Sequence, residues 1–511
     1  MATDSNENKC TTRTQNSKKL LALITLLVVC SCTAHGQPDQ ATPPNILVVV
    51  VDDLGQMDIE PNNPDTFYRT PNITRFASQG VRFDNHYSAS PVCSPSRFAL
   101  MTGRNPAVAG ATDWFHKEGD THRSERFKPA LVNEFMGREE LTIAEQLKSG
   151  GYSTAFVGKW HLGEEEQYWP ENQGFDINIG GYWSGSPKGR DGYFSPYRNP
   201  RLEDGPDGEY LTERLTTETI ALLQKMKRQE SPFFIFLSYY TVHIPLGAPE
   251  QSVSENRTRA KELGRLTEFG QEEQVWPNTE TPRRVRKTQD HPVYAAMVEQ
   301  MDKNFGRLLE ALEDLGIADD TLVIFTSDNG GLSTSEGLPT SNLPFRGGKG
   351  WLYEGGIRVP LIIRWPGRLT PGIVNSSPVI NMDLYPTILD SAGVQHAAVD
   401  GESLFPVQKP RKQPQHRALY WHYPHYSNQG GVPASAIRVG DYKLIRRLED
   451  GRVQLYDLSS DPEELLDLAS QMPEKANELA DLLNAWYTHA GARFLNPKSG
   501  VTPWRPPLKT D

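Results

Sequence analysis

The chemistry of this chain is indicated first by two polar pairs, each of which follows an apolar run. Asp52 and Asp53 come directly after the run NILVVVV, and neighbouring strand residues point to opposite faces. Both can therefore reach one ion only if the chain turns where the strand ends, which Gly55 permits. Asp328 and Asn329 come shortly after the run LVIF. All four side chains offer oxygen ligands, which suit Ca²⁺ or Mg²⁺ better than Zn²⁺, so the pairs predict a site for one divalent cation.

Two further apolar runs end near residues that move protons or bind anions. The run TAFV at residues 154–157 leads to Lys159 and His161, and the run FFIFL leads to His243. Histidine titrates near neutral pH, so it can act as an acid or a base. One strand of this kind could merely end in a polar loop, but four such strands favour one shared site.

The same runs predict the fold class. Continuous apolar runs without alternation are typical of strands buried on both faces of a parallel sheet. Helical patterns lie between the runs, and the clearest has apolar residues on one face at 298, 301, 305, 308 and 312. We therefore expect an α/β fold with a large central, mostly parallel sheet flanked by helices. In such folds ligands bind beyond the carboxyl ends of the strands.

The segment PVCSPSRFALMTGR at residues 91–104 adds a candidate nucleophile. Ser94 and Pro95 are typical of a helix start, which would place Cys93 among exposed N–H groups that favour an anion. Arg97 could offer a bidentate fork to an oxyanion. From these residues alone, Cys93 is either a reactive thiolate or a buried structural thiol.

Together these segments resemble the type I sulfatases, which belong to the alkaline phosphatase superfamily. The block CSPSR at residues 93–97 is similar to the family pattern C-x-P-x-R, in which the Cys is oxidised to formylglycine. The segments GYST and GKWH at residues 151–161, and GKG and EGGIRVP at residues 348–360, resemble further family blocks. With the two acidic segments, the resemblance extends in order from about residue 44 to residue 468.

The resemblance implies a role for each matched residue. The implied ligands of one divalent ion, Ca²⁺ by analogy, are Asp52, Asp53, Cys93 in its modified form, Asp328 and Asn329. The implied catalytic residues are Cys93, Arg97, Lys159, His161, His243 and Lys349. The implied substrate-binding residues are Lys159, Ser184, His243 and Lys349. Ser184 aligns only loosely, and an ordinary loop residue explains it equally well.

The implied activity is hydrolysis of a sulfate monoester. One hydroxyl of hydrated formylglycine would attack sulfur and form a sulfo-enzyme, and deprotonation of the second would eject sulfate. His243 with Lys349 would protonate the leaving oxygen, and His161 would take the later proton. A serine would lack the second hydroxyl, so its adduct would need water. The implied partners are a sulfated small molecule or glycan and a formylglycine-generating or anaerobic sulfatase-maturing enzyme.

Three other functions remain open from the sequence. A related metallo-phosphatase or phosphonate monoester hydrolase would use the same fold and metal set. A thiol enzyme would use unmodified Cys93 with one of the histidines, and a non-catalytic protein would only bind glycans. Aromatic residues at 182–197 and 421–426 suit either a sugar pocket or ordinary packing.

Composition restricts the class of protein, and the N-terminal segment indicates where the protein is located. The chain has 511 residues, four cysteines and a net charge of −11, so it is a poor candidate for nucleic-acid binding or a disulfide scaffold. Residues 20–29 (LLALITLLVV) follow two lysines and are too short to span a bilayer, which is typical of an export leader rather than a buried helix. Processing after Gly36, or lipidation at Cys32, would give a periplasmic, secreted or lipid-anchored protein without a transmembrane span.

The expected organisation has four parts. Residues 1–36 are a signal peptide or lipoprotein leader, residues 37–44 a linker and residues 45–400 a sulfatase catalytic domain. Residues 401–511 form a small subdomain and tail, with short strands, Gly-Asp and Asp-Gly turns, and one helix near residues 473–486. We expect the charge-rich segment 249–291 to be a solvated loop, with a substrate-contacting lid as the alternative.

Overall fold

The computed structural model describes residues 43–115, 126–273, 283–405 and 417–507, and it contains an eight-stranded central sheet. In spatial order the strands are β11 (Ile373–Asn375), β2 (Val81–Phe83), β10 (Leu361–Arg364), β9 (Thr321–Ser327), β1 (Asn45–Val51), β6 (Phe233–Tyr239), β4 (Ser153–Gly158) and β5 (Ile177–Ile179). Neighbours from β9 to β5 are parallel, whereas β10 runs antiparallel to β9 and β2. The predicted α/β fold with a mostly parallel sheet is confirmed.

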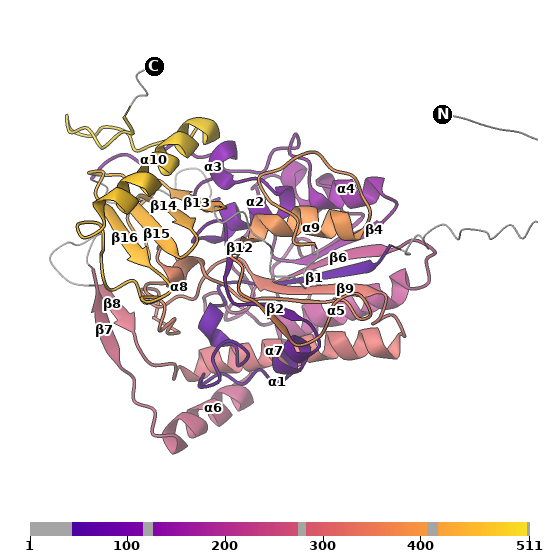
Figure 1. The fold of residues 1–511 in the computed structure, drawn as a ribbon. Helices are drawn as coiled ribbons and strands as arrows, with labels where there is room; N and C mark the ends of the chain where they lie inside the picture. Colours follow the sequence, from indigo (N-terminus) through magenta and orange to yellow (C-terminus); the bar gives the residue numbers. More distant parts are fainter. Residues whose placement is uncertain (1–42, 116–125, 274–282, 406–416, 508–511) are drawn as a thin grey trace, which may run out of the picture. The chain divides into compact units, whose positions relative to one another are not determined.

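Strand β1 lies in the middle of this sheet, between β6 and β9 (Figure 1). Its side chains from Ile46 to Val51 are all buried, as the unbroken apolar run predicts. A polar side chain here would lose its hydration without gaining a partner, so both faces of β1 have to be apolar. Because β9, β1, β6 and β4 are parallel neighbours, the residues that follow them emerge along one edge of the sheet.

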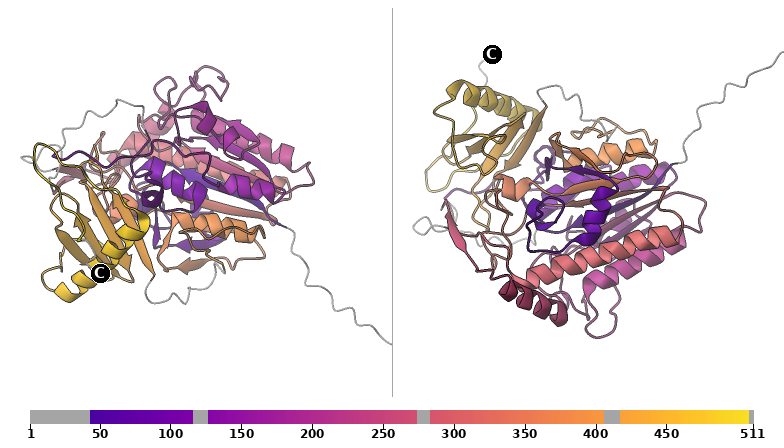
Figure 2. Two further views of the ribbon diagram at one scale, coloured as in Figure 1. Left: turned by 90° about the horizontal axis from the view of Figure 1, so that it is seen from above. Right: turned by 60° about the horizontal axis from the view of Figure 1, so that its bottom comes forward.

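Helices cover both faces of the sheet (Figures 1 and 2). One face carries α1 (Pro71–Ser78), α5 (Leu211–Met226) and α7 (Pro292–Asp314), with α6 (Glu250–Glu262) packed on α7; the other carries α2 (Cys93–Thr102), α4 (Ile143–Ser149) and α9 (Leu384–Ser391). The apolar face predicted for α7 is buried, including Val298, Phe305 and Leu312.

Short elements connect these layers. They are α3 (Pro106–Ala109), α8 (Glu354–Ile357), a parallel pair of β3 (His86–Tyr87) and β12 (Val379–Ile380), and 3-10 turns at Gln56–Asp58, Glu166–Tyr168, Pro170–Asn172 and Asn381–Asp383. The turn at Asn381–Asp383 runs directly into α9.

A small antiparallel sheet with one helix follows in sequence, as expected. Its strands are β13 (Ala418–Tyr423), β14 (Ala434–Val439), β15 (Tyr442–Arg447) and β16 (Val453–Asp457), and its helix is α10 (Pro473–Ala490). Gly440 takes a left-handed φ of 59° in the tight turn between β14 and β15. Leu479 and Leu483 of α10 pack in one apolar cluster with Ile437 and Leu444 of the sheet.

Lys443 of β15 joins the small sheet to α8 through a buried ion-pair cluster. Its Nζ lies 2.9 Å from Glu354 Oε1 and 2.8 Å from Glu464 Oε1, and none of the three side chains is exposed. Glu354 also accepts a 2.6 Å hydrogen bond from the Tyr87 hydroxyl of β3. The cluster therefore couples the small sheet to the segments that surround the central one.

The segment 249–291 differs from the solvated loop that we expected. It contains α6 and an antiparallel pair, β7 (Phe269–Glu272) and β8 (Arg283–Arg286). Arg346 holds this pair through a 2.6 Å contact between its Nη2 and Glu272 Oε1. The charges of the segment therefore include intramolecular ion pairs as well as solvated groups. Residues 274–282 lie outside the described residues.

The predicted leader at residues 1–36, Cys32 and most of the predicted linker lie outside the described residues. In the ranges that the structure describes, helices that are both long and apolar enough to cross a bilayer are absent. The cysteine that these ranges contain is Cys93, a buried free thiol.

We expect Lys443→Met to destabilise the fold by about 3–5 kcal/mol, because two buried carboxylates would lose their shared cation. Lys475→Met is the matched control, since Lys475 is partly exposed and pairs with Glu478 at the surface, where a pair contributes at most about 1 kcal/mol. Urea denaturation measures both variants. Equal losses of unfolding free energy in the two variants would contradict the role of the cluster.

Candidate active site

Asp52, Asp53 and Asp328 lie together at the carboxyl edge of the central sheet. Asp52 and Asp53 directly follow β1, and Asp328 directly follows β9. One ligand atom of each, together with the sulfur of Cys93, lies within 4.8 Å of the others. Four donors that converge in this way are suited to one shared cation.

The chain turns at Asp53 and not at Gly55. Asp53 has a left-handed φ of 62°, whereas Gly55 has an ordinary φ of −69°. Gly55 is required for space, because a Cβ there would lie 2.6 Å from Asn342 Oδ1. The turn brings both aspartates to one site, as the predicted cation site requires. The residue that adopts the left-handed conformation is Asp53, where it is strained, and not the glycine.

Asn329 supplies an atom that fits a cation. Its Nδ2 donates to Asp53 Oδ1 at 2.8 Å, which fixes the amide. Its Oδ1 is buried and has no hydrogen-bond partner among the described residues. Because a buried acceptor without a partner is costly, an electropositive ligand at this point would relieve the cost.

Each carboxylate of the cluster forms a close ion pair with a cationic side chain, and Arg97 Nη2 also lies 3.6 Å from Asp52 Oδ1. The pairs are Lys159 Nζ–Asp52 Oδ2 at 2.6 Å, Lys349 Nζ–Asp53 Oδ2 at 2.8 Å and Arg97 Nε–Asp328 Oδ2 at 2.8 Å. Arg97 Nη1 also donates to the Ser238 hydroxyl at 2.6 Å. The sequence motifs thus come together in a single network of alternating charge.

The aspartates differ in how readily they ionise. Burial and the charge of Asp328 raise the pKa of Asp52 to about 8, against the opposing effect of Lys159. Burial also disfavours the charge of Asp53, but Lys349 and His243 outweigh it and hold the pKa of Asp53 well below its usual range. A divalent cation would favour the ionised form of both groups.

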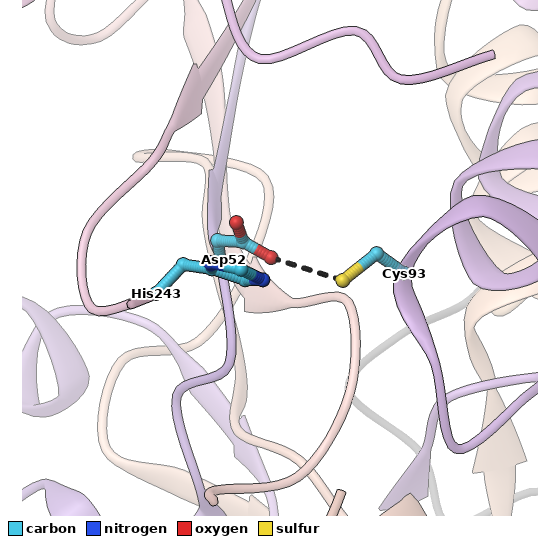
Figure 3. Close-up of side chains that lie close together, drawn as sticks. All are labelled: Asp52, Cys93 and His243. Atoms are coloured by element: carbon cyan, nitrogen blue, oxygen red, sulfur yellow. Dashed lines mark hydrogen bonds between the residues drawn. The ribbon is translucent and has the colours of Figure 1, made fainter. Parts of the chain in front are cut away.

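Cys93 is the first residue of α2 and faces this cluster (Figure 3). Its Sγ lies 3.4 Å from Asp52 Oδ1 and 3.8 Å from Asp53 Oδ1. Burial and Asp52 raise the pKa of the Cys93 thiol well above its usual value. The Cys93 sulfur therefore lies among the carboxylate oxygens of the cluster.

His161 carries its proton on a defined nitrogen. Its Nε2 lies 2.9 Å from the Phe115 carbonyl, which can only accept, so the hydrogen is on Nε2. Its Nδ1 is buried without a hydrogen-bond partner among the described residues. Burial and Lys159 lower the pKa of His161 well below its usual value, so its neutral ring offers a lone pair at Nδ1.

His243 has the opposite tautomer. Its Nδ1 lies 2.6 Å from the Ile244 carbonyl and must donate to it. Its Nε2 lies 3.7 Å from Asp53 Oδ2 and is directed toward the cluster (Figure 3). Burial and Lys349 lower the pKa of His243 to about 3. The two histidines therefore present different ring nitrogens.

A cavity of about 400 Å³ opens over these groups. Its lining includes five residues that the sequence analysis singled out, Cys93, His161, Ser184, His243 and Lys349. The rest of the lining includes Trp114, Phe115, Trp183, Lys188, Glu336, Asn428 and Gln429. The Ser184 hydroxyl donates to the Ser186 carbonyl at 2.7 Å and so stabilises the turn between these two residues. Of the two aromatic groups, Trp183 reaches the cavity, whereas Trp421, Tyr423 and Tyr426 are buried in packing.

Several lining residues were not identified from the sequence. Phe115 acts through its backbone carbonyl, which no side-chain pattern reveals. Glu336 lies next to Asn428 and Gln429 although about ninety residues separate them along the chain, as the 2.9 Å bond from Asn428 Nδ2 to Glu336 Oε1 shows. The one local signal was Gly337, which marks a turn.

Comparisons with known proteins agree with this arrangement. A family model described as "Sulfatase" matches residues 44–394, and one described as "N-sulphoglucosamine sulphohydrolase, C-terminal" matches residues 347–487. A protein of Formosa agariphila named "Sulfatase" is 29% identical over 89% of this chain and 90% of its own length. N-acetylgalactosamine-6-sulfatase of Mus musculus is 31% identical over 82% of this chain and 75% of its own length.

Solved structures agree as well. The structure of Ps i-CgsB in complex with k-i-k-neocarrahexaose superposes with a TM-score of 0.70 at 27% identity, over 87% of this chain and 93% of that one. The chain belongs to the sulfatase family, within the alkaline phosphatase superfamily, and is a hydrolase of sulfate esters. The predicted family and enzyme class are confirmed.

We expect His161 to be protonated at Nε2 and His243 at Nδ1 near pH 7, because a backbone carbonyl accepts from each. The two-bond ¹H–¹⁵N spectra of ¹⁵N-histidine-labelled protein measure the tautomers. His161→Gln and His243→Gln assign the resonances by removing one each. A hydrogen on Nδ1 of His161 would contradict the assignment.

Proposed function

We propose that this sulfatase releases sulfate from a sulfated carbohydrate by using formylglycine formed from Cys93, together with one divalent metal ion. One observation carries the proposal: Cys93 begins α2 within 3.4 Å of Asp52, with Lys159 and Lys349 paired to the adjoining carboxylates. An anionic group bound here would meet helix N–H groups and two ammonium groups. As a hydrate, formylglycine supplies one hydroxyl to attack sulfur and a second to release sulfate.

The residues that would hold the metal are Asp52, Asp53, Asp328, Asn329 and the modified Cys93. Their fit rests on the convergence of the donor atoms and on Asn329 Oδ1, which has no hydrogen-bond partner in the part of the chain that the structure describes. Oxygen donors favour Ca²⁺, which we propose as the ion. When bound, a divalent cation supplies charge stabilisation to the sulfuryl oxygens.

The remaining side chains orient the substrate and transfer protons. Lys159 and Lys349 bind the anionic oxygens, and Arg97 holds Asp328 in place. His243 presents Nε2 to the leaving oxygen and, together with Lys349, supplies the proton that this oxygen takes up. His161 presents the lone pair of Nδ1 and accepts the proton released with sulfate. Ser184 shapes the cavity through its bond to Ser186.

Two observations favour a carbohydrate substrate. Trp114 and Trp183 line the cavity, and aromatic faces beside polar groups suit sugar rings. The similar mouse protein is named for a sulfated aminosugar, and the similar solved structure contains a carbohydrate. A related metallo-phosphatase or phosphonate monoester hydrolase is the alternative. Rates on 4-nitrophenyl sulfate, phosphate and phenylphosphonate separate them, and a clear preference for phosphorus would overturn our choice.

The proposal also extends to processing and organisation. The catalytic domain at residues 45–400 and the subdomain at residues 401–511 would follow a removable leader and linker. The apolar run at residues 20–29 would direct export, to the periplasm, the medium or a lipid anchor at Cys32. A formylglycine-generating or anaerobic sulfatase-maturing enzyme would oxidise Cys93.

We expect Cys93→Ala to lower sulfate release on the order of 10⁴-fold or more, because it removes the nucleophile. Ser94→Ala, which changes the neighbouring residue, should stay far more active. Ion chromatography of released sulfate measures the effect, and peptide mass spectrometry should find formylglycine at position 93 of the active protein. Full activity in protein with an intact Cys93 thiol would contradict the mechanism.

Calcium should stabilise the protein that has been stripped by a chelator. At a free concentration about 100 times Kd, we expect a gain of about 2.7 kcal/mol, because the ion binds the folded state alone. Asp328→Asn should lose most of this gain, whereas Asp319→Asn, at an exposed position, should keep it. Calorimetric unfolding measures the shift. Equal calcium responses in both variants would argue against the site.

A further inference from the structure

The cavity has a part that the reaction does not use. Under the proposed function the sulfate group lies against Cys93, His161, His243 and Lys349, so the remaining lining would face the alcohol part of the substrate. This rim includes an acidic loop residue, Glu336, with Asn428 and Gln429 of the C-terminal part. Trp183, which is 40% exposed, and Lys188 also belong to the rim.

Glu336 is held in an unusual backbone conformation. Its φ is 52°, and the next two residues, Gly337 and Leu338, also have positive φ values of 94° and 49°. Left-handed backbone is unfavourable for residues other than glycine, and such strain persists where surrounding contacts enforce it. Glu336 as a whole is an exposed residue.

Two amides fix the carboxylate of Glu336. Asn428 Nδ2 donates to Oε1 at 2.9 Å, and Gln429 Nε2 donates to Oε2 at 3.0 Å. A carboxylate has about four acceptor positions, so each oxygen retains capacity for a further donor. The orientation of Glu336 is therefore set before any ligand binds.

The loop that carries the amides is itself anchored from three directions. The Gln429 carbonyl accepts from Thr334 Oγ1 at 2.8 Å, from Trp351 Nε1 at 3.0 Å and from Arg283 Nε at 3.2 Å. Arg283 also donates to the Asn428 carbonyl at 2.6 Å. Arg283 belongs to β8, so the charged segment that we expected to be a loop supports the cavity wall.

We propose that Glu336 determines specificity for the leaving group. It accepts a hydrogen bond from a hydroxyl or amide N–H of a sulfated sugar residue that is otherwise uncharged, such as an N-acetylhexosamine. It disfavours leaving groups that carry a second sulfate or a carboxylate at this position, because like charges repel. The inference rests on the proposed function and adds the class of sugar to it.

Glu336→Gln tests the proposal, because it removes the charge and keeps the shape and an acceptor. The substrates are 4-nitrophenyl sulfate, singly sulfated N-acetylhexosamines, and the same sugars with a second sulfate. We expect kcat/KM for the singly sulfated sugar to fall about 10- to 100-fold, the range for a hydrogen bond to a charged group. We expect turnover of the aryl sulfate to stay within about twofold and turnover of the disulfated sugar to rise.

Glu213→Gln is the matched control, since it removes one exposed carboxylate of α5. Calorimetric titration of the singly sulfated sugar into Cys93→Ala protein, with and without Glu336→Gln, adds a binding measurement that needs no turnover. Parallel losses on all substrates, or an unchanged preference between the two sugars, would overturn the proposal. If the wild type releases no sulfate while Glu336-dependent sugar binding persists, the proposed function fails and the assignment of Glu336 as a sugar acceptor stands.

Discussion

Three carboxylates buried within a few ångströms of one another are stable only if positive charge reaches them, and this constraint organises the molecule. Lys159, Lys349 and Arg97 each pair with one of the aspartates at 2.6–2.8 Å. The cations come from separate segments, so the site exists only when the whole sheet is assembled. Among the described residues Asn329 Oδ1 has no hydrogen-bond partner, and a cation would provide one.

The parallel strands of the central sheet bring these groups together, because their carboxyl ends lie along the same edge. Strands β9, β1 and β6 end along one edge, which places Asp328 and Asp52 side by side and His243 beside them. Helix α2 then brings Cys93 to the cluster with its first N–H groups exposed to an anion. Backbone carbonyls complete the arrangement by fixing which nitrogen of each histidine carries hydrogen.

The small C-terminal sheet contributes to the site as well as to stability. Lys443 joins it to α8 through a buried cluster, and the loop after β13 supplies Asn428 and Gln429 to the cavity. Arg283 of β8 anchors that same loop. Chemistry thus depends on the central sheet, while the shape of the cavity depends on contacts between distant parts of the chain.

The sequence by itself determined the sheet, the helix faces and the residues that gather at the site, because apolar periodicity and the types of polar residue at strand ends are local properties. Residues such as Asp52 and His243 were therefore predictable. Tertiary structure alone decided the turn at Asp53, the histidine tautomers and the position of Glu336 at the rim of the cavity. The His161 tautomer depends on the Phe115 carbonyl and the orientation of Glu336 depends on Asn428, whereas the His243 tautomer depends on the carbonyl of the next residue, Ile244. At the turn, Asp53 donates its backbone N–H to Asp328 Oδ1 across the sheet. No pattern of residue types encodes backbone conformation or contacts that form only when the chain is packed.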